Sequence, residues 1–245
     1  FEETVEKLLD GKKLTLVQTP KIIKDSIKFR PKEKIELCSN ILFNNCMDEF
    51  PRSHHIKDWI EEGISEKILE KYNVRYDNEN RRILFPLYNC AGDIISVKYR
   101  DLQWEKGNRS PKYGLLYKTG AKNYLYNYCF AKDYIRGLSE CILVESEKSC
   151  MKLETWGVRN SLSVGCHYLS EEQSKILIKI PFNVLIFAYD QDVELMEIEE
   201  QSKILKHYKV IYYIPSKELG AKEAPVDKGF EMWSKLYNSK VKLKG

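Results

Sequence analysis

The sequence predicts an α/β protein of 245 residues, in which a mixed α+β lobe precedes a domain built on a mostly parallel sheet. Apolar segments of strand length alternate with helical patterns from about residue 139 onward, as in parallel sheets whose crossovers are helices. Two of these apolar runs, 141–144 and 184–189, lead directly into acidic residues. Upstream, short helical segments are followed by two strands that lie close together in the chain. The sequence therefore predicts an N-terminal lobe over 1–138 and a second domain over 139–245.

The N-terminal lobe is predicted to hold two helices and a hairpin. Gly63 separates the helices, and Ser65 stands where an N-cap is favoured. Pro86 lies within the first strand and, because proline cannot donate to a ladder, it favours an edge or end position. The turn at 91–93 joins the two strands as a hairpin. The expected elements are helices at 55–62 and 66–72 and strands at 82–88 and 94–99.

The second domain is predicted to contain four strands, each followed by a helix. Its strands are rich in apolar and β-branched residues, which is typical of parallel strands buried on both faces. Gly157 ends the first helix, and Ser170 is placed to cap the second. The expected order is strand 141–145, helix 147–156, strand 159–164, helix 170–178, strand 183–189, helix 193–207, strand 208–214 and helix 226–237.

The composition indicates a soluble cytoplasmic protein. Hydrophobic residues make up 43% of the chain and the net charge is +4. No apolar run approaches the ~20 residues that a membrane-spanning helix needs, and the N-terminus lacks the zones of a secretory signal. The seven cysteines include no C-x₂-C pair, so neither a zinc site nor a disulfide framework is predicted. The absence of an initiator methionine is expected of a fragment or a processed chain.

Three carboxylates are expected to meet at the carboxyl ends of the predicted parallel strands, where α/β sheets place their ligands. Glu145 follows the first strand, and Asp190 and Asp192 follow the third. Like charges about 4 Å apart repel by roughly 4 kcal/mol at an effective dielectric of 20, so such a cluster needs a cation. Oxygen ligands in an open site favour Mg²⁺ or Mn²⁺. The alternative is that the Asp-x-Asp pair only caps the following helix.

Basic and aromatic residues are interleaved between 98 and 122. Lysine and arginine can hold phosphates while bases stack on aromatic rings, so this stretch predicts single-strand nucleic-acid binding. A solvated basic face is the alternative interpretation. The basic residues are Lys98, Arg100, Lys106, Arg109, Lys112, Lys118 and Lys122, and the aromatic ones are Tyr99, Trp104, Tyr113 and Tyr117.

Segments 143–149, 161–165 and 187–192 resemble a Toprim domain, the metal-binding module shared by DnaG-type primases, topoisomerases and some nucleases. Upstream, the order of motifs is similar to that of bacterial and phage DnaG-type primases. The segments that carry this second resemblance are 55–76, 82–88, 92–100, 111–113 and 125–126. Together the two resemblances cover roughly residues 50–237.

The resemblance implies a primase core that makes short RNA primers on single-stranded DNA by metal-dependent nucleotidyl transfer. Two or more Mg²⁺ or Mn²⁺ ions are implied, together with nucleoside triphosphates, nascent RNA and, through other regions, a replicative helicase. The implied catalytic residues are Glu145, Asp190 and Asp192. Asp227 is a further candidate metal ligand or, equally, a helix cap, and Glu147 is expected to support the ligands. The residues implied in binding template and nucleotide phosphates are Lys98, Arg100, Lys112 and Lys122.

The sequence also departs from the primase pattern. Ser149 stands where many primases place an aspartate, and no zinc-binding module precedes the core in this sequence. Two alternatives therefore stay open beside the primase. One is a Toprim-type nuclease, and the other is a non-catalytic module that binds single strands or loads another replication factor. The Glu-Ser-Glu variant at 145–147 fits a phage or mobile-element origin.

Overall fold

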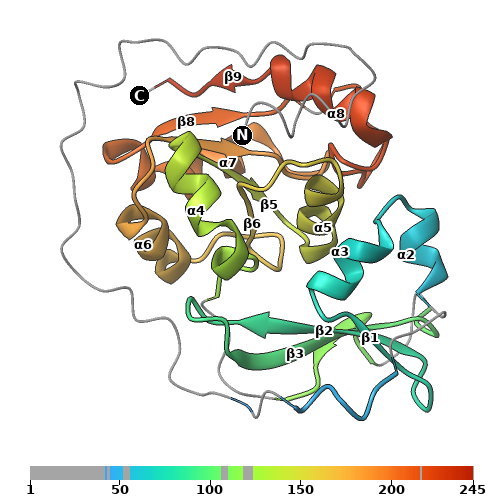
Figure 1. Ribbon diagram of the computed structural model, residues 1–245. Coiled ribbons are helices and arrows are strands. Elements are labelled where there is room, and N and C mark those ends of the chain that lie inside the picture. Colours follow the sequence, from blue (N-terminus) through green and yellow to red (C-terminus); the bar gives the residue numbers. More distant parts are fainter. Residues whose placement is uncertain are drawn as a thin grey trace, which may run out of the picture.

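The computed structural model describes residues 42, 45–51, 56–105, 110–117, 124–215 and 217–244. These residues form two lobes, one on an antiparallel sheet and one on a mostly parallel sheet (Figure 1). The predicted fold class is thereby confirmed. Lys106, Arg109, Lys118 and Lys122 of the basic stretch lie outside the described residues.

The first lobe consists of two short helices and a four-stranded sheet. The expected hairpin is present, with Phe85 opposite Lys98 in the ladder. Pro86 lies on strand 82–88, which has a neighbouring strand on each side. One of these neighbours, strand 75–77, pairs only with residues 82–84, so Pro86 itself has an open edge on that side, as predicted. The elements are α2 (Lys57–Glu61), α3 (Glu66–Lys71), β1 (Arg75–Asp77), β2 (Arg82–Tyr88), β3 (Ile94–Asp101) and β4 (Tyr113–Leu115), with the strands in the order β1-β2-β3-β4.

The second lobe is a five-stranded sheet in the order β6-β5-β7-β8-β9, parallel except for its last strand. Helices cover the sheet, as Figure 1 shows. Its elements are α4 (Tyr128–Leu138), β5 (Glu140–Val144), α5 (Glu147–Thr155), β6 (Ser161–Ser163), α6 (Glu171–Lys179), β7 (Val184–Phe187), α7 (Leu195–Ser202), the 3₁₀ turn η3 (Leu205–His207), β8 (Val210–Tyr213), α8 (Gly229–Asn238) and β9 (Val241–Lys242).

Helix α4 belongs spatially to the parallel sheet. Its buried residues Tyr128, Ala131 and Ile135 share a core with Leu143 of β5 and Leu162 of β6. The sequence-based division places this helix in the N-terminal lobe, and the boundary at 138/139 stays a prediction.

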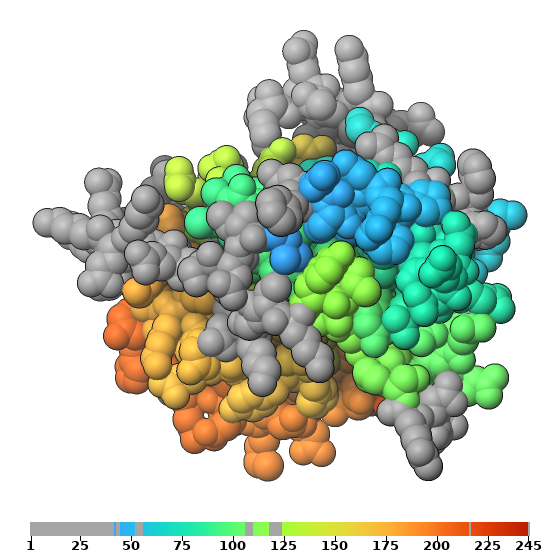
Figure 2. Space-filling view, turned by 90° about the horizontal axis from the view of Figure 1, so that it is seen from below, coloured from blue at the N-terminus to red at the C-terminus, as the bar shows by residue number. Residues whose placement is uncertain are grey.

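One hydrophobic core runs through both lobes. It joins Trp59 of α2 and Phe85 of β2 to Met151 of α5 and Trp233 of α8. A separate small core lies on the outer face of the hairpin, where Met47 packs against β2 and β3. Figure 2 shows residues 45–51, in blue, lying over that face. The two lobes are therefore packed against each other through a shared core.

Local signals explain where the helices begin. Ser170 caps α6 as predicted, in a capping box with Gln173. The third helix of the domain was expected over 193–207, but α7 begins at Leu195 because Glu194 and Glu197 form its capping box. No described helix has the length and apolar character that crossing a membrane demands.

Candidate active site

Glu145 and Asp190 meet at the carboxyl ends of two adjacent parallel strands. Leu143 of β5 pairs with Phe187 of β7, so both chains leave the sheet on the same side. The Asp190 backbone N–H donates to Glu145 Oε1 at 2.8 Å, across 45 residues of sequence. The strand ends therefore bring together the carboxylates that the sequence analysis singled out, and they fix one oxygen of Glu145.

Burial and neighbouring negative charges raise the pKa values of Asp190 and Glu145. Burial, followed by the charges of Glu145, Asp227 and Asp192, raises the pKa of Asp190 to about 7. Burial also raises the pKa of Glu145, against the lowering effect of the Asp190 N–H. All four carboxylates are thus close enough to interact, and Asp190 is the one that a nearby cation would affect most.

Helix capping does not account for the aspartates. The N-cap of α7 is Glu194, and the N-cap of α8 is Lys228, which makes no side-chain cap hydrogen bond. Asp227 instead accepts from the Ala224 N–H at 2.9 Å and from Lys152 Nζ at 2.9 Å. The alternative in which these aspartates serve only as helix caps is therefore wrong.

Lys152 is a buried cation that sequence reasoning missed. It lies on α5, only 3% exposed, between Asp227 and Glu62, whose carboxylate is 3.8 Å away. Burial alone would raise the pKa of Asp227, but the hydrogen bond from Lys152 lowers it. Lysine among the apolar residues of a buried helix was the signal available in the sequence. Asp227 is thus held ionised at the edge of the carboxylate cluster.

His167 is a second residue that the sequence analysis did not place in the site. Its Nδ1 lies 3.2 Å from Glu145 Oε2, and its Nε2 lies 3.4 Å from Glu197 Oε2. Partial burial would lower the pKa of His167, but the neighbouring Glu145 raises it. Its position two residues after Gly165, in the loop that follows β6, was the only sequence signal. Both oxygens of Glu145 are consequently engaged by protein groups.

Two of the predicted phosphate-binding residues lie together between the lobes. Arg100 Nη1 donates to Tyr113 Oη at 3.1 Å, and Lys112 Nζ lies 5.7 Å from the Trp104 ring centre. Burial and the charges of Arg100 and Lys148 lower the pKa of Lys112. Arg100 Nε is buried and, among the described residues, finds no hydrogen-bond partner. Arg100 and Lys112 therefore place two positive charges close together.

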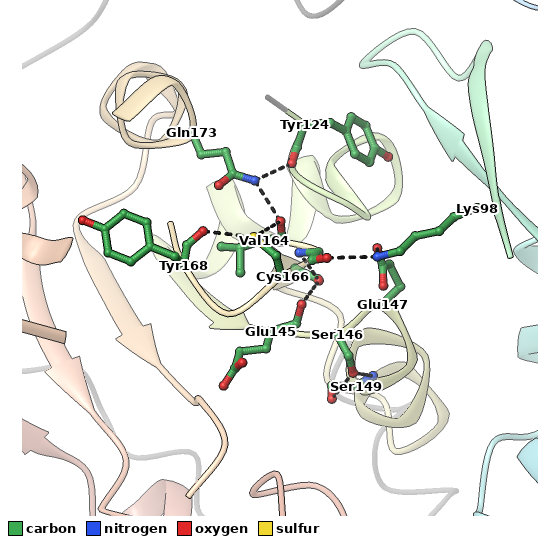
Figure 3. Close-up of polar contacts among 12 residues, drawn as sticks. Lys98, Tyr124, Glu145, Ser146, Glu147, Ser149, Val164, Cys166, Tyr168 and Gln173 are labelled. Carbon is green, nitrogen blue, oxygen red and sulfur yellow. Dashed lines mark hydrogen bonds and ion pairs between the residues drawn. The ribbon is translucent and has the colours of Figure 1, made fainter. Parts of the chain in front are cut away.

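Lys98 and Glu147 are paired with each other. Lys98 Nζ lies 2.6 Å from Glu147 Oε1 and donates to the Gly165 carbonyl at 2.9 Å (Figure 3). Glu147 is 5% exposed and lies in the first turn of α5. Ser149, which replaces the usual aspartate, has its hydroxyl 2.8 Å from that of the N-cap Ser146. The Ser149 backbone N–H donates to the Ser146 hydroxyl as the N-cap bond of α5, and the Ser149 hydroxyl lies beside that cap.

The carboxylates fit a divalent metal of the Mg²⁺ type. No group of three or more histidine, cysteine or acidic side chains in the described parts of the chain is already arranged to hold an ion. Mg²⁺, however, needs only one or two carboxylates beside waters and substrate phosphates. Asp190, with its raised pKa, and the exposed Asp192 supply all-oxygen ligands at an open strand end. The donor chemistry favours a metal shared with a phosphate.

Comparison with known sequences finds DNA primases. No family model matches the chain. A SPbeta prophage-derived uncharacterized protein, YorJ of Bacillus subtilis, is 26% identical over 88% of this chain and 65% of its own length. The DNA primase of Staphylococcus aureus strain MSSA476 is 29% identical over 58% of this chain, and 23% of that primase is covered. The chain thus spans less than two thirds of each of these relatives.

Solved structures that match this fold include primase cores. The zinc-binding and RNA polymerase domains of the Aquifex aeolicus primase match with a TM-score of 0.65 and 20% identity, over 80% of this chain and 59% of that chain. The Escherichia coli primase catalytic core matches with a TM-score of 0.62 and 14% identity, over 82% and 79%. A DnaG primase catalytic domain bound to single-stranded DNA matches with a TM-score of 0.60. The resemblance to DnaG-type primases is therefore confirmed, and the fold is that of their catalytic cores.

Proposed function

We propose that this chain is a primase catalytic core, which synthesises short RNA primers on single-stranded DNA by nucleotidyl transfer. The observation that carries the proposal is the meeting of Glu145, Asp190, Asp192 and Asp227 at the strand ends of a primase-core fold. Sequence similarity to a DNA primase over 58% of the chain supports the same activity. Single-stranded DNA, nucleoside triphosphates and nascent RNA are the proposed ligands, and a replicative helicase is a further proposed partner.

Each acidic residue has a distinct task in this proposal. Asp190 and Asp192 hold Mg²⁺ or Mn²⁺, and Glu145 either shares the ligation or takes the proton of the attacking hydroxyl. Divalent ions at this site supply activation of the primer 3′-hydroxyl and neutralisation of the triphosphate and departing pyrophosphate. The Asp190 N–H and His167 orient the Glu145 carboxylate, since each lies against a different oxygen. Asp227 stays ionised beside Lys152 and adds negative charge to the site.

Arg100 and Lys112 are the proposed phosphate contacts. Their side chains lie near each other on the first lobe, and Lys112 also lies close enough to Lys148, on α5 of the second lobe, for the two charges to interact. Arg100→Met should lower the affinity for single-stranded DNA and reduce the slope of log K against log salt by about 0.7, the value of one phosphate contact on a single strand. Fluorescence anisotropy with a labelled oligonucleotide measures the slope, and an unchanged slope would argue against this contact.

A primer-synthesis assay tests the activity directly. The wild-type chain is incubated with single-stranded DNA, labelled nucleoside triphosphates and Mg²⁺ or Mn²⁺. Asp190→Asn should abolish labelled oligoribonucleotides, because a carboxamide is a poor ligand for a hard cation. Glu199→Gln, a surface change on α7, serves as the matched control and should leave the yield unaltered. Wild-type primer yield from D190N would refute the assignment.

The same assay separates the two alternatives. A Toprim-type nuclease would shorten the labelled template and incorporate no nucleotide. A non-catalytic binding module would retain the template in a gel shift without either product. Either result would refute the primase proposal; a nuclease would still use the carboxylate cluster to hold metal ions, whereas a binding module would leave the cluster without a catalytic role.

A further inference from the structure

Lys98 connects the two lobes at the edge of the carboxylate site. It extends from β3 of the antiparallel sheet and reaches Glu147 and the Gly165 carbonyl, at 2.6 Å and 2.9 Å. We propose that Lys98 is a positioning residue that fixes the basic lobe relative to the catalytic carboxylates, and that it does not bind phosphate. The expected effect of Lys98 on primer synthesis rests on the proposed function, whereas its contact between the lobes does not.

Both partners of Lys98 are directly joined to Glu145. Glu147 follows it by two residues and begins α5. The Gly165 N–H donates to the Glu145 carbonyl at 3.0 Å, and the Ser163 hydroxyl donates to the same oxygen at 2.7 Å. Figure 3 shows Lys98 approaching this group from the opposite lobe. One ammonium therefore touches the start of α5, two residues after Glu145, and the loop after β6 that hydrogen-bonds to the Glu145 carbonyl.

Backbone conformation and close packing both favour glycine at position 165. Its φ is +74°, a left-handed conformation that side chains rarely adopt. A Cβ there would lie 3.1 Å from Glu147 Oε1 and 3.7 Å from Lys98 Nζ. The ammonium can reach both the carboxylate and the carbonyl because no side chain separates them. The loop, the helix start and Lys98 thus form one tightly fitted contact.

The pairing of Lys98 argues against a phosphate role. A lysine ammonium has three donors, and two are taken by Glu147 and Gly165. The Glu147 side chain is 6% exposed, so withdrawing Lys98 to a phosphate would leave a buried carboxylate unpaired. Arg100 lies two residues along β3 and on the same face. The contact of Lys98 thereby joins the face of β3 that carries Arg100 to the segments next to Glu145.

The test compares Lys98→Met with Glu147→Met, alone and combined. If Lys98 positions the site, each single change lowers the maximal rate of primer synthesis tenfold or more, since a misplacement of about 1 Å can cost about 100-fold. The combined K98M/E147M variant is then no worse than either single change. The salt slope of single-stranded DNA binding stays at the wild-type value in all three. Lys175→Met, which breaks the exposed ion pair with Glu171 on α6, is the matched control.

If Lys98 instead binds a phosphate, K98M and E147M should change the affinity for single-stranded DNA in opposite directions. K98M would weaken binding and reduce the salt slope by about 0.7. E147M would release Lys98, strengthen DNA binding and steepen the slope. That pattern would overturn the proposal. Lys98→Gln removes the charge but retains a donor toward Gly165, so the comparison stands even where K98M folds poorly.

Hydrogen–deuterium exchange tests the contact independently of any enzymatic activity. K98M and E147M should each raise the exchange rate in a peptide covering 161–169, while K175M should not. Unchanged exchange in both variants would refute the positioning role even if the wild type makes primers. If the wild type makes no primers, the exchange result still decides whether Lys98 fixes this loop. Failure of the positioning role can therefore be told apart from failure of the proposed function.

Discussion

Replacing Asp190 by asparagine should stabilise the metal-free protein at neutral and alkaline pH. The carboxyl ionises at an ordinary pKa of 3.8 in the unfolded chain and at about 7 in the folded protein. Below pH 3.8 both states carry the proton, so the ionisation of Asp190 does not lower the free energy of unfolding. As the pH rises from 3.8 to 7 the unfolded state ionises first, so stability is progressively lost. Above pH 7 the loss is constant.

The size of this effect follows from the two pKa values. Their difference corresponds to at most about 4 kcal/mol, at 1.36 kcal/mol for each pH unit. Asp190 is only partly buried, and solvent screens its interaction with the exposed Asp192. A realistic gain for Asp190→Asn is therefore about 1–2 kcal/mol at pH 8. The gain should fall by more than half at pH 5.

Urea unfolding in EDTA at pH 5 and pH 8 measures the difference between the two proteins. Adding Mg²⁺ should stabilise the wild type and narrow its gap to D190N, because a cation offsets the repulsion among the carboxylates. Glu199→Gln, a change at an exposed position of α7, should show neither the gain nor the pH dependence. If D190N is less stable than the wild type at pH 8 in EDTA, or if the difference does not change with pH, the electrostatic reasoning is wrong.

Two further changes test the frame around the site. Lys152→Met leaves Asp227 and Glu62 facing each other without their shared cation, and because both are partly exposed it should destabilise the fold by about 2 kcal/mol in urea unfolding. An unaltered midpoint would contradict that role. Ser170→Ala removes the cap and the capping box with Gln173, costing about 1 kcal/mol in thermal unfolding. Primer yield should persist in S170A, and its loss in the folded variant would show that α6 takes part in the site.

The sequence predicted the parallel strands because each is a continuous apolar run with a clear end. β7 lies inside its expected range and β5 begins one residue before its own, and each leads toward the acidic residues foreseen. Strands buried on both faces carry their signal locally, in hydrophobicity alone. Their spatial neighbours follow from the handed crossover rule. The meeting of Glu145 and Asp190 could therefore be anticipated from one chain.

Short or weakly marked elements could not be predicted in this way. β1, β4 and β9 have three, three and two residues, and each exists because a longer strand lies beside it. Helix α4 has no capping side chain: Asn127 precedes it at φ +76° and makes no cap hydrogen bond, and its amide instead donates to Ser161. A helix whose start is fixed by tertiary contacts lacks the local cues that sequence reasoning uses.

The partners of charged residues could not be predicted from the sequence either. Lys98 stood among basic residues that suggested a nucleic-acid surface, and nothing in the chain near it pointed to Glu147. The pair is separated by 49 residues and formed by two different lobes. Side-chain pairing of this kind depends on how the lobes pack, whereas strand ends depend on the sheet. The carboxylates were therefore easier to place than the cations.

Helix α5 collects the ion pairs that join the lobes. It starts two residues after Glu145, and its acidic and basic side chains bind residues of β3, α2 and α3. These pairs are Lys98 with Glu147, Glu62 with Lys148, and Lys71 with Glu154. The shared apolar core already holds the lobes together, but hydrophobic contact is non-directional. These pairs range from buried to partly exposed, and such ion pairs contribute little net stability while permitting few alternative arrangements. Their concentration on α5 is therefore better explained by the need to set the basic lobe against Glu145 than by a need for stability.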